Sequence, residues 1–400
     1  MRLLFVADGR SPIARNWIEP FIQAGDEVHL ASSYLCEPMA GLASYQMVPV
    51  ALSGLRSGSG GASGGAAGIR WRTRARHYLG PLTVPFSASK LRSLIRELQP
   101  DLVHALRVPF EGMMVAWSDP YAPLAISTWG NDFTLHAGGS PLMRWLTART
   151  MRRADGLHAD CRRDLRLAKE WGFSAGNPAV VLPGNGGLAP VFLQSEPPQL
   201  PETSEVARLL AEIGPERPVV VNPRGFRAYV RNDTFFQSIP LVRAVHPAVL
   251  FVCPTMKDDP VAEGWVDELS IHSHVRLLGR LNPREVAVLL RRAQLMVSPS
   301  QHDGTPNSLL EAMASGAVPI AGDLESIREW INPGENGLLI DPEDPADLAQ
   351  AVSRGLSRDQ WRQQAEVQNR SLIQKRASRE VVYREARNFY ERMQQHTAML

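Results

Sequence analysis

Short apolar runs alternate with stretches of helical spacing along most of the chain. The first run, 3–7, ends in Asp8-Gly9. Residues 12–24 then carry apolar side chains at helical spacing, and 27–31 form the next apolar run. Short continuous apolar runs of this kind are typical of buried parallel strands. The beginning of the chain therefore predicts a strand–helix–strand unit of an α/β fold.

The alternation continues in two blocks. Further predicted strands lie at 101–105, 124–128, 180–182, 219–222, 249–253, 275–278, 295–298, 318–321 and 337–340. The polar, proline-rich stretch 194–204 separates the two blocks and is typical of an interdomain linker. We therefore expect an α/β protein with two tandem Rossmann-like doubly wound domains, 1–195 and 205–375, that face a central cleft.

Length and charge agree with this organisation. The chain has 400 residues, more than the roughly 250–300 at which a single hydrophobic core stops growing. Its 43 basic residues nearly balance 41 acidic ones, so bulk charge gives no support for a nucleic-acid partner.

The three cysteines lie far apart without a CxxC pair, so we expect a reduced cytoplasmic setting. The first apolar run is too short for a signal peptide.

A basic and aromatic stretch at 70–78 follows a Gly/Ser-rich segment, 56–68, that we expect to be a loop. The stretch has two interpretations. It is either a solvated edge of the first domain, or it contacts an anionic acceptor or anionic lipid headgroups. The second interpretation predicts peripheral contact with the inner face of the membrane.

The most informative stretch runs from Ser298 to Gly316, after a predicted strand and into a predicted helix. Pro306 suits a helix start, and the free N–H groups of the first turn would face an anion at the end of the strand. Asp303 and Glu311 flank this turn and could accept hydrogen bonds from sugar hydroxyls. The alternative is a surface loop whose acid merely favours the helix dipole.

The string DGTPNSLLEAMASGAVPIA places Asp303 eight residues before Glu311. It resembles the E-x7-E signature of retaining glycosyltransferases of family 4, which have the GT-B fold. The segment NPGENGLLIDPEDPADLAQAV (332–352) resembles the continuation of that family. The resemblance implies that a nucleotide-sugar donor binds the second domain and that an acceptor glycan, glycolipid or small molecule binds the first.

The resemblance also implies roles for residues on the donor side. Asp303 would contact the donor sugar and Glu311 the ribose, although this chain has Asp where the family usually has Glu. The residues expected to line the sugar and diphosphate are Gly304, Thr305, Pro306, Asn307 and Ser308, and those expected beside the nucleobase are Arg280 and Leu281.

A departing diphosphate needs positive charge, and the family supplies an Arg and a Lys after the first strand of the second domain. Arg224 matches that Arg, whereas the Lys is absent. Arg231 is our first expected replacement and Arg227 the second. The alternative interpretation is a solvated basic loop.

On the acceptor side, Gly9 and Arg10 stand where the family usually has a glycine pair, and Trp129 stands where it often has a histidine. The nearby polar residues Asn131, Asp132 and His136 come from the same loop, and Asp132, His136 and His104 are candidates for contacting the reacting hydroxyl. A lone histidine near a strand end is as readily a structural residue.

The resemblance further implies that 376–400 form a helix that returns to the first domain, and that catalysis needs neither a protein nucleophile nor a bound metal or other cofactor. Three alternatives remain open at this point: a GT-B nucleotide-sugar epimerase, a non-catalytic sugar-nucleotide-binding protein, and a nicotinamide-dependent oxidoreductase. The last would need GxGxxG after the first strand, where this chain has DGRSPI.

Overall fold

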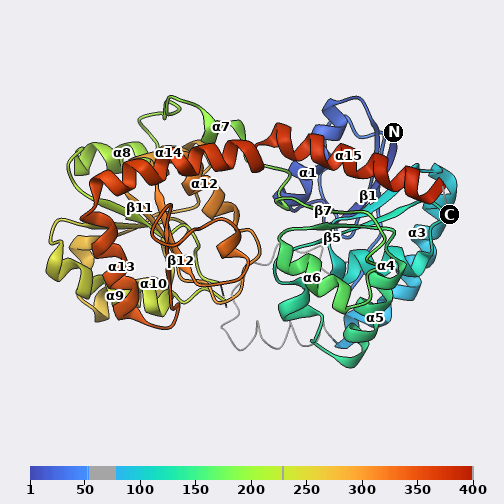
Figure 1. Ribbon diagram of the computed structural model, residues 1–400, viewed down its shortest axis with the longest axis horizontal. Helices are drawn as coiled ribbons and strands as arrows, with labels where there is room; N and C mark the ends of the chain where they lie inside the picture. Colours follow the sequence, from blue (N-terminus) through green and yellow to red (C-terminus); the bar gives the residue numbers. More distant parts are fainter. Residues whose placement is uncertain (52, 54–77, 228, 399–400) are drawn as a thin grey trace. The chain divides into compact units, whose positions relative to one another are not determined.

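The computed structural model describes residues 1–51, 53, 78–227 and 229–398. The predicted loop 56–68 and the basic stretch up to His77 lie outside the described residues. The chain divides into two compact units, which we call unit 1 (1–187 with 380–400) and unit 2 (188–379). Figure 1 follows the chain through both.

Unit 1 contains a seven-stranded sheet in the order β3-β2-β1-β4-β5-β6-β7. Every neighbouring pair of its strands is parallel. The strands are β1 (Arg2–Ala7), β2 (Glu27–Ser32), β3 (Ser44–Met47), β4 (Leu102–Ala105), β5 (Leu124–Thr128), β6 (Gly156–Ala159) and β7 (Ala179–Val181). Their carboxyl ends therefore meet at one edge of the sheet, where α/β proteins bind ligands.

Unit 2 contains a six-stranded parallel sheet in the order β10-β9-β8-β11-β12-β13. Its strands are β8 (Val219–Val221), β9 (Leu250–Cys253), β10 (Val275–Leu277), β11 (Leu295–Ser298), β12 (Val318–Gly322) and β13 (Leu338–Ile340). The order reverses direction between β8 and β11, which is the usual ligand position in a doubly wound sheet.

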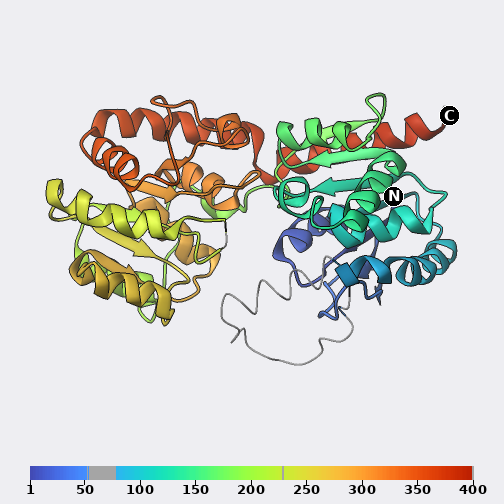
Figure 2. The same cartoon turned by 90° about the horizontal axis from the view of Figure 1, so that it is seen from below.

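Helices flank the strands of each unit (Figure 2). Those of unit 1 are α1 (Pro12–Gln23), α3 (Val84–Leu98), α4 (Met113–Ser118), α5 (Pro141–Arg153), α6 (Arg162–Glu170) and α15 (Arg379–Ala398). Those of unit 2 are α7 (Pro190–Leu193), α8 (Glu205–Ile213), α9 (Asn232–Val245), α10 (Pro260–Glu268), α11 (Pro283–Arg292), α12 (Asn307–Ser315), α13 (Pro345–Leu356) and α14 (Asp359–Arg376). In the described part of the chain, none of them is long and apolar enough to span a bilayer.

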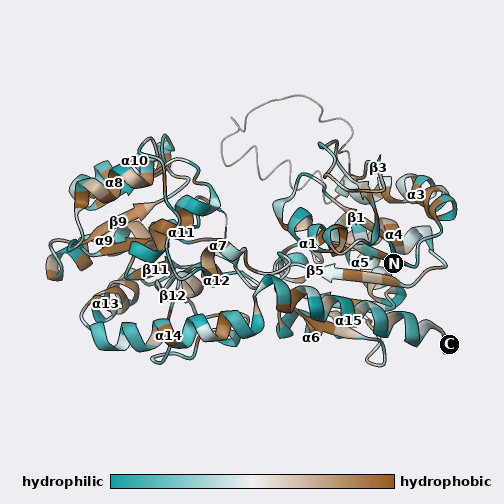
Figure 3. Ribbon diagram, turned by 90° about the horizontal axis from the view of Figure 1, so that it is seen from above, coloured by the Kyte–Doolittle hydropathy of each residue, from teal (hydrophilic) through white to brown (hydrophobic). Residues whose placement is uncertain are grey.

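The parallel strands bury both of their faces. On β1, Leu4 and Val6 join an apolar cluster with α3 and α4, whereas Leu3 and Phe5 join a second cluster with α1 and α15. This alternation follows from the two-residue repeat of a strand. It explains why the strands are continuous apolar runs, coloured brown for most of their length in Figure 3, while α14 is largely teal.

The C-terminal helix α15 packs on unit 1 beside α1, where Tyr390 stacks against Phe21. A buried chain of hydrogen bonds crosses this contact. The hydroxyl of Tyr390 accepts from Trp17 Nε1 at 3.1 Å and lies 2.6 Å from His104 Nδ1. The chain continues from His104 Nε2 to Ser127 Oγ at 2.8 Å, in the interior of the sheet.

His158 ends this chain and fixes its direction. Its Nε2 lies 2.9 Å from the carbonyl oxygen of Leu182 and must donate to it, so Nδ1 accepts from Ser127 Oγ at 2.8 Å. Ser127 then accepts from His104 Nε2, and His104 Nδ1 accepts from the hydroxyl of Tyr390. Both rings are neutral in this arrangement, and burial lowers the pKa of His158 to about 4.

The sequence and the structure agree on most strands, but β3 and β6 were not predicted. The sequences SYQM of β3 and GLHA of β6 have no continuous apolar run. The units also divide at Gly187, before the predicted linker 194–204, and α15 belongs to unit 1 from Glu380 onward. The earlier division has a physical reason, since Leu188 and Phe192 are buried in the core of unit 2.

Replacing Tyr390 with Phe would leave Trp17 Nε1 and His104 Nδ1 buried without their partner. We expect the free energy of unfolding to fall by about 1–3 kcal/mol, measured by urea denaturation. Tyr383→Phe is a matched control, because Tyr383 packs on Phe21 from the same helix but lies outside the hydrogen-bond chain. Equal losses in the two variants would contradict the importance of this chain.

Candidate functional site

The loops that follow β8 and β11 meet at the carboxyl edge of unit 2, because these two strands are neighbours in the sheet. Arg224 lies in the first loop and Asp303 in the second. Arg224 Nη2 donates to Asp303 Oδ2 at 2.6 Å, and only 8% and 11% of the two side chains are exposed. The structure thus brings together two of the predicted site residues in a buried ion pair.

The loop around Arg224 is fixed by two asparagines. Asn222 Oδ1 accepts from the backbone N–H of Arg224 at 3.1 Å, and Asn222 Nδ2 donates to Asn232 at 3.2 Å. Asn232 in turn donates to the carbonyl oxygen of Gly225 at 2.9 Å. Gly225 has φ +60°, a conformation that L side chains rarely adopt. Sequence reasoning missed Asn232, the first residue of α9.

The first turn of α12 faces this ion pair. Ser308 Oγ accepts from Arg224 Nη1 at 3.1 Å. No side chain caps the helix, which follows Pro306 in extended conformation. The uncapped N–H groups and the helix dipole favour an anion at this position. Gly304 and Thr305 are buried behind the turn, where Thr305 Oγ1 accepts from Trp330 Nε1 at 3.2 Å, while Asn307 and Ser308 are half-buried.

Glu311 lies one turn further along α12. No described residue donates a hydrogen bond to its carboxylate. Burial raises the pKa of Glu311 to about 7, and the positive charge of Arg224 opposes part of this rise. A half-buried acid without a partner is unfavourable for folding and is typical of functional sites.

Two of the other predicted arginines are already engaged. Arg231 forms ion pairs with Asp233 at 2.7 Å and Glu343 at 2.9 Å. The role of Arg231 in place of the family's Lys stays a prediction. Arg227 is exposed and donates to the carbonyl oxygen of Arg224 at 3.3 Å and to the hydroxyl of Tyr229 at 3.2 Å.

Arg280 and Leu281 follow the edge strand β10, and β9 lies between that strand and β8. Arg280 is exposed and Leu281 half-buried. The neighbouring Gly279 is fixed from two sides: its N–H donates to Glu205 at 3.1 Å, and its carbonyl oxygen accepts from Thr255 at 3.0 Å. The proposed contact of this segment with the nucleobase stays a prediction.

At the carboxyl edge of unit 1, Asp132 is buried and holds its own loop. Its carboxylate accepts from Arg107 Nε at 2.9 Å and from the backbone N–H groups of Trp129 and Val108 at 3.1 and 3.2 Å. Burial raises the pKa of Asp132, and Arg107 opposes this rise. Asp132 therefore positions the loop, and its expected contact with the reacting hydroxyl stays a prediction. Sequence reasoning missed Arg107, which directly follows the carboxyl end of β4.

The loop itself offers neutral polar groups. Within the described residues, Thr128 Oγ1, Trp129 Nε1 and Asn131 Oδ1 are buried without a hydrogen-bond partner. His136 is half-buried on the next turn. Such unpaired groups are rare in folded proteins and often mark a bound water or ligand.

Two other predicted acceptor-side residues, Arg10 and His104, have partners within the protein. Arg10 is paired with Asp8 at 2.9 Å and stacks over the ring of Tyr34, next to Gly9. His104 is fully buried, with both ring nitrogens engaged in the chain that reaches α15, and burial holds its pKa well below the usual value. This corrects the expectation that His104 contacts a reacting hydroxyl; it is a core residue.

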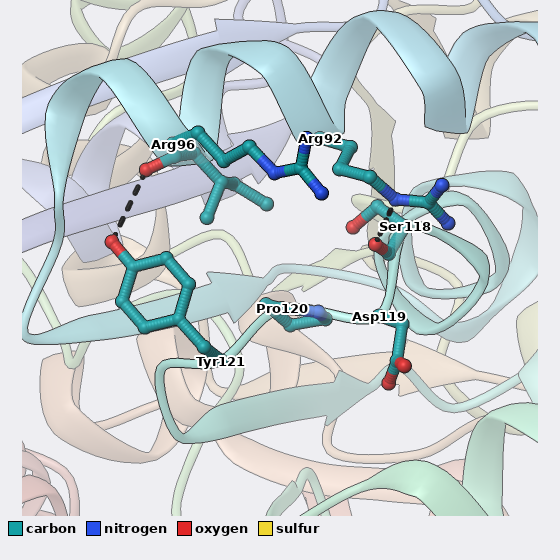
Figure 4. A pocket seen from close by; sticks show the side chains of 7 residues that line it. Arg92, Arg96, Ser118, Asp119, Pro120 and Tyr121 are labelled. Carbon is teal, nitrogen blue, oxygen red and sulfur yellow. Dashed lines mark hydrogen bonds between the residues drawn. The ribbon is translucent and has the colours of Figure 1, made fainter.

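A pocket of about 500 Å³ in unit 1 lies away from these loops (Figure 4). It is formed by α3 and the segment before β5, with Arg92, Arg96 and Tyr121 among its lining residues. Arg92 donates to the carbonyl oxygen of Ser118, and Tyr121 donates to that of Ile95.

In the described chain, no group of three or more His, Cys, Asp or Glu side chains could hold a metal ion. The expected independence from metal stays a prediction.

Two protein-family models match the chain. Residues 217–358 match the model described as glycosyl transferases group 1, and residues 9–184 match the one described as a glycosyl transferase 4-like domain. Together the matched segments cover most of both units.

Curated relatives match over shorter segments. A D-inositol 3-phosphate glycosyltransferase of Corynebacterium urealyticum is 31% identical over 100 residues, which are 25% of this chain and 24% of the relative. A glycogen synthase of Mycobacterium tuberculosis is 29% identical over 119 residues, 29% and 28% of the two chains. The match thus spans about a quarter of the length of these relatives.

Solved structures match over the whole chain. The Anabaena protein HepE in complex with UDP-glucose has a TM-score of 0.71 at 14% identity, covering 100% of both chains. Sucrose-phosphate synthase of Thermosynechococcus elongatus has a TM-score of 0.74 at 16% identity, also covering 100% of both. At such identities the likeness concerns the fold, and it confirms the predicted two-domain Rossmann-like architecture.

Glu311→Gln tests the burial of the Glu311 carboxyl. An acid whose pKa is higher in the folded protein binds more protons when folded, so stability falls as the pH rises through about 7. The variant should therefore exceed the parent in stability at pH 8 by up to about 3 kcal/mol, with a much smaller difference at pH 5. Urea denaturation at both pH values measures this. Glu202→Gln, in an exposed loop of unit 2, is the control and should show no such gain in stability. If the stability difference between Glu311→Gln and the parent does not depend on pH, the raised pKa of Glu311 is contradicted.

Proposed function

Since the chain belongs to the family-4-like glycosyltransferases of the GT-B fold, we propose that it transfers a sugar from a nucleotide-sugar donor to an acceptor hydroxyl with retention of the anomeric configuration. The products would be glycans, polysaccharides or glycolipids. One observation carries the proposal: an arginine, an uncapped helix start and an unpaired acid converge at the carboxyl edge of unit 2.

The donor side divides into two chemical tasks. The carboxylate of Glu311 accepts hydrogen bonds from the ribose hydroxyls, which replace the water that burial removes. Arg224 and the first N–H groups of α12 stabilise the negative charge that develops on the departing diphosphate. These groups supply positive charge from the protein itself, so we propose a reaction that needs no bound metal. Retained activity in EDTA would support this.

The acceptor side lies on unit 1, where the loop after β5 offers Trp129 Nε1 and Asn131 Oδ1 to a hydroxyl group. In same-face attack, the acceptor oxygen bonds to the anomeric carbon as the bond to the diphosphate breaks, and the departing diphosphate takes the acceptor proton. This step needs no protein nucleophile.

Incubation with UDP-, GDP- and ADP-sugars without an acceptor separates the alternatives. Slow hydrolysis of one donor supports a transferase, and isomerisation of the sugar would instead support an epimerase. Binding without turnover, followed by thermal shift, would support a sugar-nucleotide-binding protein and overturn the proposal.

Replacing Arg224 with Gln should lower kcat about 100-fold or more, because one preorganised donor to the developing charge is lost. The measurement is release of nucleoside diphosphate with the donor identified above. Arg354→Gln is the control, since Arg354 is exposed on α13. A rate near that of the parent would assign the diphosphate to another residue.

We also propose that unit 1 contacts an anionic membrane surface. Tyr78, Leu82 and Phe86 recur every four residues before and within α3, and 59%, 58% and 81% of their surfaces are exposed. Leu82 lies in the 3-10 turn Gly80–Thr83 and Phe86 in the first turn of α3. Four arginines, at 70, 72, 74 and 76, directly precede them in the sequence. A sequence in which exposed apolar side chains follow a run of basic residues suits the interface of an anionic bilayer.

Sedimentation with vesicles tests this contact. The protein should bind vesicles that contain one quarter phosphatidylglycerol better than vesicles of phosphatidylcholine alone. The double variant L82E/F86E should lose most of this binding, whereas V367E, at an apolar side chain of unit 2 that is 71% exposed, should keep it. Equal binding of both variants and the parent would exclude this surface.

A further inference from the structure

We infer that Asp303 acts through Arg224: its carboxylate holds the guanidinium in the orientation that presents Nε to the donor diphosphate. Asp303 is then a positioning residue, in addition to or in place of the sugar contact implied by the resemblance. The inference rests on the proposed function, in which Arg224 contacts the diphosphate.

The three nitrogens of the Arg224 guanidinium have different surroundings. Nη2 donates to Asp303 Oδ2 at 2.6 Å, and Nη1 donates to Ser308 Oγ at 3.1 Å. Nε is buried and has no acceptor in the described part of the chain. Because Nη1 and Nη2 each donate to a different partner, the plane of the guanidinium is fixed, and Nε is the one nitrogen that lacks an acceptor among the described residues.

An unpaired N–H of a buried guanidinium is costly. An oxygen of a phosphate group would satisfy it, and charge-assisted hydrogen bonds between arginine and phosphate are among the strongest in proteins. Ser308, which holds Nη1, lies in the uncapped first turn of α12. The unpaired N–H and the free N–H groups of the helix therefore belong to one anion site.

Asp303 is itself fixed in place. Its carbonyl oxygen accepts from Ser326 Oγ at 2.7 Å, and the residue is only 8% exposed. The side chain is one methylene shorter than the glutamate usual at this position of the family. With its backbone fixed and its side chain short, the carboxylate reaches Arg224.

A double-mutant cycle tests whether Asp303 acts through Arg224. The measured quantity is the affinity for UDP, by calorimetry, in the parent, D303N, R224Q and the double variant; GDP or ADP replaces UDP if thermal shift selects another base. We expect D303N to weaken binding about tenfold, a common size for residues coupled in one network. In the R224Q background, D303N should have no further effect.

UDP carries no donor sugar, so this cycle separates the two roles of Asp303. If the aspartate only contacts the sugar, D303N leaves UDP affinity unchanged and alters the preference between UDP-glucose and UDP-galactose. If Asp303 positions Arg224, the affinities for UDP-glucose and UDP-galactose fall by the same factor. D303E keeps the carboxylate and should recover most of the lost affinity.

Three outcomes would overturn the inference. The first is an unchanged affinity of D303N for UDP, and the second is a higher affinity, which would mean that Asp303 competes with phosphate for Arg224. The third is an additive loss of affinity in the double variant, as expected if D303N only damages the structure. D323N is the control, because Asp323 pairs with Arg328 at 2.6 Å on an exposed surface. Failure of the proposed function has another signature: no nucleoside diphosphate binds the parent, or R224Q alone has no effect.

Discussion

The ion pair between Arg224 and Asp303 is the interaction on which the site of unit 2 depends. A buried arginine needs a partner, because an unpaired charge in a poorly hydrated place costs several kcal/mol. A partner that saturated the guanidinium would leave nothing for a ligand. Here one carboxylate oxygen and one hydroxyl bind the two terminal nitrogens, and Nε stays unpaired. These two bonds hold the arginine in place, and they leave Nε available to an anion.

Glu311, like Arg224, is a charged side chain that the protein leaves without a full set of hydrogen-bond partners, but its charge is negative. A carboxylate that made hydrogen bonds within the protein would stabilise the fold, but it could not accept hydrogen bonds from a ribose. Burial without a donor raises its pKa to about 7, so the folded protein carries an energetic cost that the proposed contact with a ribose would remove. Proteins commonly break local rules of stability at functional sites in this way. Asn222 and Asn232, by contrast, are fully used to hold the loop.

Strands buried on both faces were predictable, since such strands must be apolar throughout; β8, with the sequence VVV, is an example. The edge strand β3 is only half-buried, so its residues carry no such signal. At the site, spacing and resemblance singled out Arg224, Asp303 and Glu311. They could not reveal that Asp303 binds Arg224, or that His104 faces α15, because both facts depend on which distant residues the fold brings together. Tyr390 lies 286 residues from His104 along the chain.

The two units leave different polar groups without partners at their carboxyl edges, and this difference supports the proposed placement of the ligands. In unit 1, Asp132 binds both Arg107 and the backbone of its own loop, and Arg10 is paired with Asp8. The loop after β5 leaves a hydroxyl, an indole N–H and an amide oxygen unpaired, which suit an uncharged hydroxyl; at the start of α6, Asp164 Oδ2 is also without a hydrogen-bond partner. In unit 2 the unpaired groups are an arginine N–H, uncapped helix amides and a carboxylate. These match the diphosphate and the ribose of a nucleotide, which supports the proposed placement of the donor on unit 2.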